Sequence, residues 1–232
     1  MKLLIDIGNS SAKIAIANGT DLIYSEHVAQ PWQDAIVRLR KDYDISRCIV
    51  SNVAKEDITL HMALQQHHIP TLWLSQSTEC NLKGIPDGYG ADRIAADLGA
   101  LTQAAGKTIL VIDAGTCITY DLIDRTGTLI SGVISPGIGL RLKAMHEHTA
   151  LLPLLTPDSD TPLMGHDTHT SMMSAAIHGT RFEVEGYIRS MQREYPDLTV
   201  FMTGGDAIHP TLTVGTPVIY DLHLLFKGLN TL

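Results

Sequence analysis

Two short segments of the chain place a carboxylate directly after an apolar run, with a glycine two residues later. In the first segment Asp6 precedes Gly8, and in the second Asp113 precedes Gly115. Glycine lets the backbone approach a ligand closely, and the Asn, Ser and Thr residues that follow supply hydrogen-bond donors at the same bend. Such a turn can wrap phosphate oxygens while its carboxylate holds a metal-bound water. One copy alone would be better explained as a hairpin turn, but two copies favour phosphate binding.

Two further segments could carry chemistry. Gly90–Arg93 opens a predicted helix, where Asp92 could accept a proton beside the carboxylate-binding guanidinium of Arg93. The competing explanation is that an acidic residue in a first turn only stabilises the helix. Thr203–Gly205 follows a predicted strand, and its glycines would let a flat ligand lie against the backbone. A plain strand-to-helix turn explains this last segment equally well.

Signatures of other chemistries are missing from the sequence. It contains no G-x-x-x-x-G-K-[ST], and Pro136–Gly139 does not match a dinucleotide-binding motif. The eleven histidines lack cysteine or carboxylate partners at metal-site spacing, so we interpret them as solvated side chains. No G-x-S-x-G elbow indicates a nucleophilic serine.

The elements that must position these segments follow from hydrophobic periodicity and turn signals. Asn18-Gly19 is expected as a hairpin turn, and Gly106 as the end of a helix rich in Ala and Leu. Strands are expected at 3–7, 12–17, 21–28, 47–53, 69–74, 108–113, 117–123, 128–134 and 198–203. Helices are expected at 32–42, 56–68, 91–105, about 139–148 and 168–194.

The two Asp-x-Gly turns belong to an internal repeat. Residues 3–17 and 110–123 share one plan, in which a strand ends in Asp and a glycine turn leads to a second strand. Two copies half a chain apart imply two similar half-domains that face each other. We place the half-domains at residues 1–106 and 107–232, packed closely because no Pro- or Ser-rich linker separates them. The fold class is α/β.

Composition limits the possible functions further. The net charge of −8 at pH 7 argues against nucleic-acid binding. No stretch is long and apolar enough to span a bilayer, and Asp6 interrupts the N-terminal apolar run too early for a secretory signal. The three cysteines are distant and odd in number, which favours reduced thiols in the cytoplasm. We expect Cys117 to be a small buried apolar residue.

These residues resemble the type III pantothenate kinases of the actin/hexokinase-like superfamily. The first turn is similar to that family's D-x-G-N-[TS] signature, and Gly90–Arg93 matches its G-x-D-R. Five later segments resemble further motifs of the family in the same order along nearly the whole chain: residues 113–119 (D-x-G-T-A-x-T), 131–137 (G-G-x-I-x-P-G), 149–153 (T-A-x-L-P), 165–168 (G-x-x-T) and 203–205 (T-G-G).

The chain departs from the family pattern at several positions. Ser131 replaces a glycine, Cys117 replaces an alanine, and Ala175 stands where a glycine is common. The family usually has a substrate-contacting tyrosine some residues before G-x-D-R. Tyr89 is the available candidate here, although it lies closer to Gly90 than that pattern has it.

The resemblance implies a fold and an activity. It implies duplicated actin-like, ribonuclease H-like half-domains with mixed sheets flanked by helices. The implied reaction is the ATP-dependent phosphorylation of pantothenate to 4′-phosphopantothenate, the first step of coenzyme A biosynthesis, with Mg²⁺ and a monovalent cation, K⁺ or NH₄⁺.

The resemblance also implies roles for individual residues. Asp92 would be the general base, Asp113 would bind the monovalent cation, and Asp6 would hold Mg²⁺ through water. ATP would contact Asp6, Ile7, Gly8, Asn9, Ser10, Ser11, Ala12, Lys13 and Thr116. Pantothenate would contact Tyr89, Gly90, Ala91, Asp92, Arg93 and, from a second subunit, Thr168.

Two other functions remain open at this point. One is a non-catalytic regulatory relative of the Bvg accessory factor type, which shares motifs with the kinases. The other is a kinase of the same superfamily with another small-molecule acceptor, such as a sugar. Joint retention of Asp6, Asp92, Arg93, Asp113 and Thr116 favours the pantothenate kinase.

The segment 168–195 leads us to expect a homodimer. Its apolar residues are too widely distributed for one core-facing stripe, so we expect a second partner beyond the half-domain itself. Burial between the half-domains is the alternative. The residues concerned are Met172, Met173, Ile177, Phe182, Val184 and Ile188.

Overall fold

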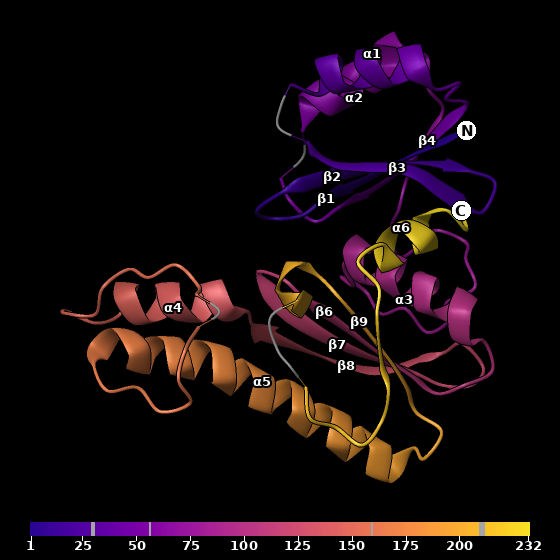
Figure 1. The fold of residues 1–232 in the computed structure, drawn as a ribbon. Coiled ribbons are helices and arrows are strands. Elements are labelled where there is room, and N and C mark those ends of the chain that lie inside the picture. The colour runs from indigo at the N-terminus through magenta and orange to yellow at the C-terminus, as the bar shows by residue number, and fades with distance from the viewer. Residues whose placement is uncertain (29–30, 56, 159, 209–211) are drawn as a thin grey trace. The chain divides into compact units, whose positions relative to one another are not determined.

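The computed structural model describes residues 1–28, 31–55, 57–158, 160–208 and 212–232 (Figure 1). The chain forms two compact units, each with its own five-stranded sheet. The first unit contains Met1–Ala105, Gly127–Leu129 and His223–Leu232, and the second contains Gly106–Thr126 and Ile130–Leu222. The last ten residues thus fold with the first unit, although they follow the expected boundary at Gly106-Lys107.

The sheet of the first unit has the order β3-β2-β1-β4-β5. β1 is antiparallel to β2, and β2 to β3, whereas β1 and β5 run parallel to β4. The strands are β1 (Lys2–Ile7), β2 (Ala12–Asn18), β3 (Asp21–Val28), β4 (Arg47–Asn52) and β5 (Thr71–Trp73).

Helices cover both faces of this first sheet (Figure 1). Leu3, Ile5 and Ile7 alternate along β1 and pack in one core with α1 (Trp32–Asp42) and α2 (Ile58–Gln66). Leu4 points the other way and is equally buried. On that opposite face α3 (Ala91–Ala104) contacts β4, and α6 (Leu224–Leu229) contacts β1. Burial on both faces explains why β1 reads as a continuous apolar run.

The second sheet has the order β10-β9-β6-β7-β8. If the strands are renumbered within each unit, this order is the same as that of the first sheet, with β6 antiparallel to β7 and parallel to β9. The internal repeat is therefore confirmed at the level of topology. The strands are β6 (Ile109–Ala114), β7 (Cys117–Ile123), β8 (Leu129–Pro136), β9 (Thr199–Thr203) and β10 (Val218–Tyr220).

Three helical segments complete the second unit: α4 (Ile138–Glu147), α5 (Thr168–Glu194) and the short 3₁₀ helix η1 (Gly205–Ile208). The two apolar faces expected of α5 both find partners inside this unit. Met173 and its neighbours pack against α4, whereas Val184 and Ile188 pack against the sheet. The expectation that one face lacks a partner within the unit is therefore wrong for these residues, and only Phe182 among the six is largely exposed, at 49%.

Most expected elements are present, with bounds that differ by at most two residues at either end. The exceptions are short: β10, η1 and α6 were not anticipated, and β5 has only three residues. The hairpin turn between β2 and β3 lies one residue later than expected, at Gly19-Thr20, with Gly19 at a φ of 60°. Glu56, within the helix expected at 56–68, lies outside the described residues.

Helices α3 and α6 cross at two glycines. A Cβ atom on Gly228 would lie 1.8 Å from the carbonyl oxygen of Ala95, and one on Gly99 would lie 2.0 Å from that of Leu224. Because backbone meets backbone at both points, no side-chain rotation could relieve these contacts. The crossing therefore requires glycine at positions 99 and 228.

We predict that Gly228→Ala and Gly99→Ala each lower the free energy of unfolding by about 1–3 kcal/mol, since the helices must move apart. Thermal unfolding followed by circular dichroism would measure this as a melting temperature lower by about 2–4 °C per kcal/mol. Gly186→Ala, inside α5 where an added Cβ meets nothing within 4 Å, is the matched control. It should be neutral or stabilising by up to about 1 kcal/mol. Equal melting temperatures for all three variants would contradict the close crossing.

Candidate functional site

The first candidate turn joins β1 to β2 in the first unit. Gly8 donates its N–H to the carbonyl of Ser11 at 3.0 Å, which closes the loop between the paired residues Ile7 and Ala12. Ile7 is buried, whereas Asn9, Ser10 and Ser11 are exposed. The turn thus presents polar side chains to solvent from a strand end that is fixed in the core.

Asp6 stands at the carboxyl end of β1, half-buried. The hydroxyl of Ser51 donates to Asp6 Oδ1 at 3.1 Å, and Ser51 itself is fully buried on the parallel neighbour β4. Lys13 pairs with Asp6 across β2 and so shares its face of the sheet. Sequence reasoning missed Ser51. The available signal was its position near the end of an expected strand, because carboxyl ends of parallel strands meet at one edge.

Gly90–Arg93 forms the start of α3, with Gly90 as the N-cap and Ala91 buried. Asp92 Oδ1 accepts the backbone N–H of Arg93 at 2.8 Å. A Cβ on Gly90 would lie 2.5 Å from that same oxygen, so glycine makes room for the carboxylate. The contact is the one that the helix-start explanation predicts, and it also fixes the Asp92 carboxylate at the positive end of the helix.

Val53 links this helix start to the first turn. Its N–H donates to the carbonyl of Ile7 at 3.0 Å, and its Cγ1 lies 3.5 Å from the Cβ position of Gly90. Within the first unit, Val53 therefore contacts both the strand end that leads into the Asp6 turn and the Gly90–Arg93 segment.

Tyr89 directly precedes the Gly90–Arg93 segment and contacts Arg93. The guanidinium carbon of Arg93 lies 4.1 Å from the centre of the Tyr89 ring, within cation–π range. The Tyr89 hydroxyl donates to Asp97 Oδ2 at 2.8 Å. Asp97 is fully buried in α3 and was also missed. An acidic residue inside the Ala- and Leu-rich pattern of this helix was the signal that could have found it.

The second candidate turn joins β6 to β7 in the second unit. Gly115 donates its N–H to the carbonyl of Cys117 at 3.0 Å. The paired residues that bound it are Ala114 and Ile118, so this turn is one residue shorter than the first. Asp113 is half-buried, and Thr116 and Cys117 are exposed. The expectation of a buried Cys117 is wrong because the strand that it begins emerges from an exposed turn.

Two glycines from other motifs pack against this second turn. Gly204 has a φ of +95°, and a Cβ there would lie 2.2 Å from the carbonyl oxygen of Ala114 and 2.5 Å from Asp113 Oδ1. Gly137 donates its N–H to the carbonyl of Thr116 at 3.0 Å. A Cβ on Gly137 would lie 2.0 Å from the carbonyl oxygen of Gly115. Three motifs that are distant in sequence thus converge within the second unit.

Thr168 is the exposed first residue of α5. Asp167 caps this helix, accepting the N–H of Thr170 at 2.7 Å, and the Thr170 hydroxyl completes a capping box. Hydrogen bonds from the Thr170 backbone and hydroxyl lower the pKa of Asp167. Thr168 belongs to the second unit and Gly90–Arg93 to the first, so the residues predicted to bind pantothenate are divided between units.

Cation binding at these turns would depend on carboxylate and carbonyl oxygen atoms. The described residues contain no cluster of three or more His, Cys, Asp or Glu side chains that could hold a metal ion. Mg²⁺ is commonly bound through one or two carboxylates plus substrate phosphates, so Asp6 is a sufficient protein ligand for it. Gly204 packs closely against two hard oxygen atoms, Asp113 Oδ1 and the carbonyl of Ala114, because a Cβ there would lie within 2.5 Å of both. Oxygen atoms of this type are the ligands that hard cations prefer.

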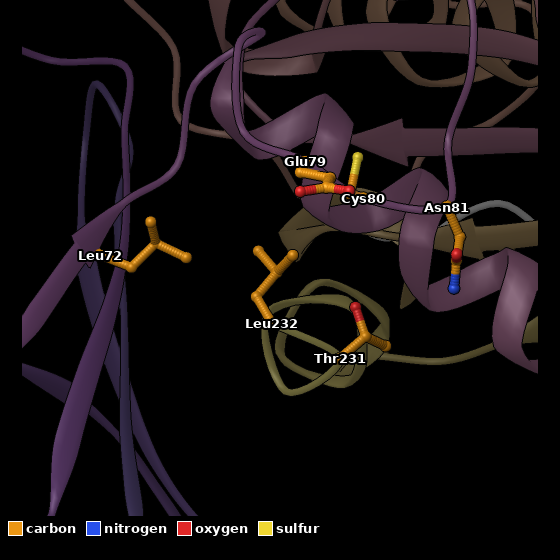
Figure 2. Close-up of a pocket in the computed structure, with 6 residues that line it drawn as sticks. All are labelled: Leu72, Glu79, Cys80, Asn81, Thr231 and Leu232. Atoms are coloured by element: carbon orange, nitrogen blue, oxygen red, sulfur yellow. The ribbon is translucent and has the colours of Figure 1, made fainter.

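A separate pocket lies in the first unit, and none of these residues lines it (Figure 2). Its lining comes from β5, from the loop after it and from the C-terminus: Leu72, Glu79, Cys80, Asn81, Thr231 and Leu232. The Cys80 thiol contacts the carbonyl of Leu82 at 3.7 Å. Within the described parts of the chain, no helix is both long and apolar enough to cross a membrane.

Comparison with known proteins finds a family that matches this chain. A family model described as type III pantothenate kinase matches residues 2–190. The type III pantothenate kinase of Bacteroides fragilis (strain YCH46) is 39% identical over 99% of this chain and 96% of its own length.

Solved structures show the fold. A conserved putative Baf family transcriptional activator from Campylobacter jejuni matches with a TM-score of 0.59 at 22% identity, covering 99% of this chain and 96% of its own. A putative 2-dehydro-3-deoxygalactonokinase from Sinorhizobium meliloti matches with a TM-score of 0.61 at 12% identity, covering 100% and 97%. The expected actin-like fold with duplicated mixed sheets is confirmed.

Proposed function

Since this chain belongs to the type III pantothenate kinase family, we propose a division of roles among its residues in the ATP-dependent phosphorylation of pantothenate. The reaction transfers the γ-phosphoryl group of ATP to a hydroxyl of pantothenate and yields 4′-phosphopantothenate, at the first step of coenzyme A biosynthesis. The assignment of this activity rests on the full-length match to a member of the family. The two Asp-x-Gly turns and the Gly90–Arg93 helix start carry the assignment of residues.

We assign ATP binding to residues of both units. In the first unit these are residues 6–13, whose turn presents Asn9, Ser10 and Ser11 outward from a rigid strand end. In the second unit Thr116 is exposed on the corresponding turn. Phosphoryl transfer needs little covalent help from the protein, so positioning the phosphates and neutralising their charge are the main tasks. When bound through water at Asp6, Mg²⁺ would offset charge on the phosphate oxygens.

We assign pantothenate binding to Tyr89–Arg93 and Thr168. The Arg93 guanidinium, held over the Tyr89 ring, can pair with the carboxylate of pantothenate. Asp92, fixed at the start of α3, can accept the proton of the attacking hydroxyl. A cationic carboxylate partner next to a base suits an acceptor that carries both a carboxylate and a hydroxyl, as pantothenate does.

Two other functions can be tested against pantothenate phosphorylation: a non-catalytic regulatory protein and a kinase with another acceptor, such as a sugar. The solved structures from C. jejuni and S. meliloti share only the fold with this chain, at 22% and 12% identity. Measuring ADP release with and without pantothenate separates all three. We expect release that depends on pantothenate. Pantothenate-independent ATP binding without turnover would support the regulator, and turnover with a sugar alone would support another acceptor.

The base assignment predicts that Asp92→Asn reduces kcat by about 10²- to 10⁴-fold, because the amide keeps the shape of the carboxylate but accepts no proton. Steady-state ADP release would measure the loss, and circular dichroism would verify folding. Asp42→Asn, at the exposed end of α1, removes the same charge and should leave kcat unchanged. Turnover of Asp92→Asn within a few-fold of the unmodified enzyme would rule out the base role.

We further propose a monovalent cation site at Asp113, whose carboxylate oxygen Oδ1 and the neighbouring Ala114 carbonyl both lie beside Gly204 at the second turn. A second cation would offset phosphate charge in a site that lacks a P-loop lysine. We predict that K⁺ or NH₄⁺ raises the rate at fixed Mg-ATP, and that Asp113→Ala loses this response. Rates measured in K⁺, Na⁺ and choline buffers provide the test. Equal rates in all three buffers at saturating substrates would remove the site from the proposal.

We also propose a cytoplasmic homodimer. All three cysteines are free thiols, as the reduced cytoplasm requires. The second unit exposes large apolar side chains on α5 and on the segment before it, and such side chains commonly mark a protein–protein surface. They are Leu151 (92% exposed), Leu154 (64%), Leu163 (52%), Met164 (83%) and Phe182 (49%).

The dimer proposal predicts complementation between inactive chains. Thr168 would act on the substrate of the partner subunit, so mixing Thr168→Ala with Asp92→Asn should assemble one intact site in each mixed dimer and restore part of the activity. Light scattering would establish the oligomeric state, and ADP release would measure rescue. A fully active monomer at assay concentration would refute the dimer. Proven subunit exchange without rescue would refute only the shared site.

A further inference from the structure

An ionic network in the second unit reaches the second Asp-x-Gly turn without belonging to it. Its centre is Arg141, in the first turns of α4. The guanidinium Nε of Arg141 donates to the carbonyl of Pro136 at 2.8 Å, and a terminal nitrogen donates to the Ser135 hydroxyl at 3.2 Å. The same terminal nitrogen forms a salt bridge with Glu183 on α5. Arg141 therefore ties the strand end at Ser135-Pro136 to α5.

Glu183 is enclosed by donors. It accepts from Arg141 and from the hydroxyl of Tyr120 on β7, at 2.9 Å from the latter. The salt-bridged side chains are only 21% exposed for Arg141 and 24% for Glu183, so solvent screens them less than a surface pair. Burial by itself raises the pKa of Glu183, but hydrogen bonds from Arg141, Ser135 and Tyr120 outweigh it and hold that pKa below its usual value. Glu183 is therefore ionised at neutral pH.

The network ends at the candidate ATP-binding turn. Pro136, whose carbonyl Arg141 holds, directly precedes Gly137. Gly137 donates its N–H to the Thr116 carbonyl at 3.0 Å and lies too close to Gly115 for any side chain to fit between them. The backbone N–H of Arg141 also donates to the Gly137 carbonyl at 3.0 Å. Displacing Arg141 would thus move the residue that supports the Thr116 turn.

We propose that Arg141 and Glu183 are positioning residues for nucleotide binding, which hold Gly137 against the Gly115-Thr116 turn. The proposal rests on the proposed function, because it takes Thr116 as a contact of ATP. Neither side chain touches the turn itself; both act through the backbone of Pro136 and Gly137. A device of this kind affects the nucleotide more than the acceptor, since Thr168 alone among the proposed acceptor residues belongs to the same unit.

Two variants that change the size of the side chain only slightly test the ionic network. Glu183→Gln keeps the shape of the side chain but removes its charge, and Arg141→Lys keeps the charge but loses the planar group that contacts three partners at once. A hydrogen bond to a charged group contributes about 1.5–3 kcal/mol, so we expect each variant to raise the KM for Mg-ATP by about 10-fold or more. The KM for pantothenate should change less than about twofold, within the scatter of surface substitutions. Glu147→Gln, from the exposed Lys143–Glu147 pair on the same helix α4, is the matched control and should change neither value.

Direct binding separates this proposal from the kinase assignment. Titration calorimetry with a nonhydrolysable ATP analogue measures nucleotide affinity without turnover, so a weaker affinity in Glu183→Gln and Arg141→Lys supports the positioning role even if pantothenate is not the acceptor. Ser135→Ala removes one partner of Arg141 and provides a milder variant if either fails to fold. A lower melting temperature with unchanged nucleotide affinity would show that the network only braces α4 against α5, and would overturn the proposal. Equal losses of affinity for nucleotide and pantothenate would overturn it as well.

Discussion

The parallel pairing of β1 with β4, and of β6 with β9, is the constraint on which both candidate turns depend. In each sheet an aspartate is the second-last residue of the central strand, and it pairs with a hydroxyl residue near the end of the parallel neighbour, Ser51 opposite Asp6 and Thr203 opposite Asp113. Parallel strands bring their carboxyl ends to one edge, where the backbone leaves the sheet and ligands can approach. The duplicated topology therefore produces two related carboxylate turns from one structural plan.

The copies have diverged in how their turns are supported. The first turn closes on itself through the Gly8–Ser11 hydrogen bond, and its carboxylate is held by a buried serine. The second turn is one residue shorter and lies against backbone from two other segments, at Gly137 and Gly204. Contacts between backbones leave no room for side chains, so the second turn requires glycine at positions 137 and 204. The roles proposed above differ in the same way, with phosphates at the first turn and a cation at the second.

Charge explains why an acidic protein can bind a triphosphate. The chain carries a net charge of −8 and has no P-loop lysine, so cations beside Asp6 and Asp113 would supply the neutralisation that phosphoryl transfer requires. Arg93 is proposed to bind a different anion, the carboxylate of pantothenate, because the Tyr89 ring holds its guanidinium at the start of α3. Arg141 is likewise committed, through Glu183, to the support of a turn. Each of these two arginines therefore has a partner that fixes its position.

The sequence by itself determined the features that depend on near neighbours. Continuous apolar runs specified β1 and β6, alternation of apolar residues specified β2 and β3, and apolar spacing specified α1, α3 and α5, because these patterns reflect local backbone geometry. The Asp-x-Gly spacing revealed both turns, and the repeat revealed the duplication. The short elements β10, η1 and α6 were missed, because a strand of three residues and helices of four and six residues are too short to show a clear period.

Only the tertiary structure decided which distant residues meet. Ser51 at Asp6, Gly204 and Gly137 at the second turn, and Glu183 at Arg141 all arise from pairings between elements far apart in the chain. The same holds for α5, whose two apolar faces found α4 and the sheet inside one unit rather than an external partner. A single sequence records which residues are apolar or charged, but the partner of each is fixed by strand order and helix packing, which no local pattern encodes.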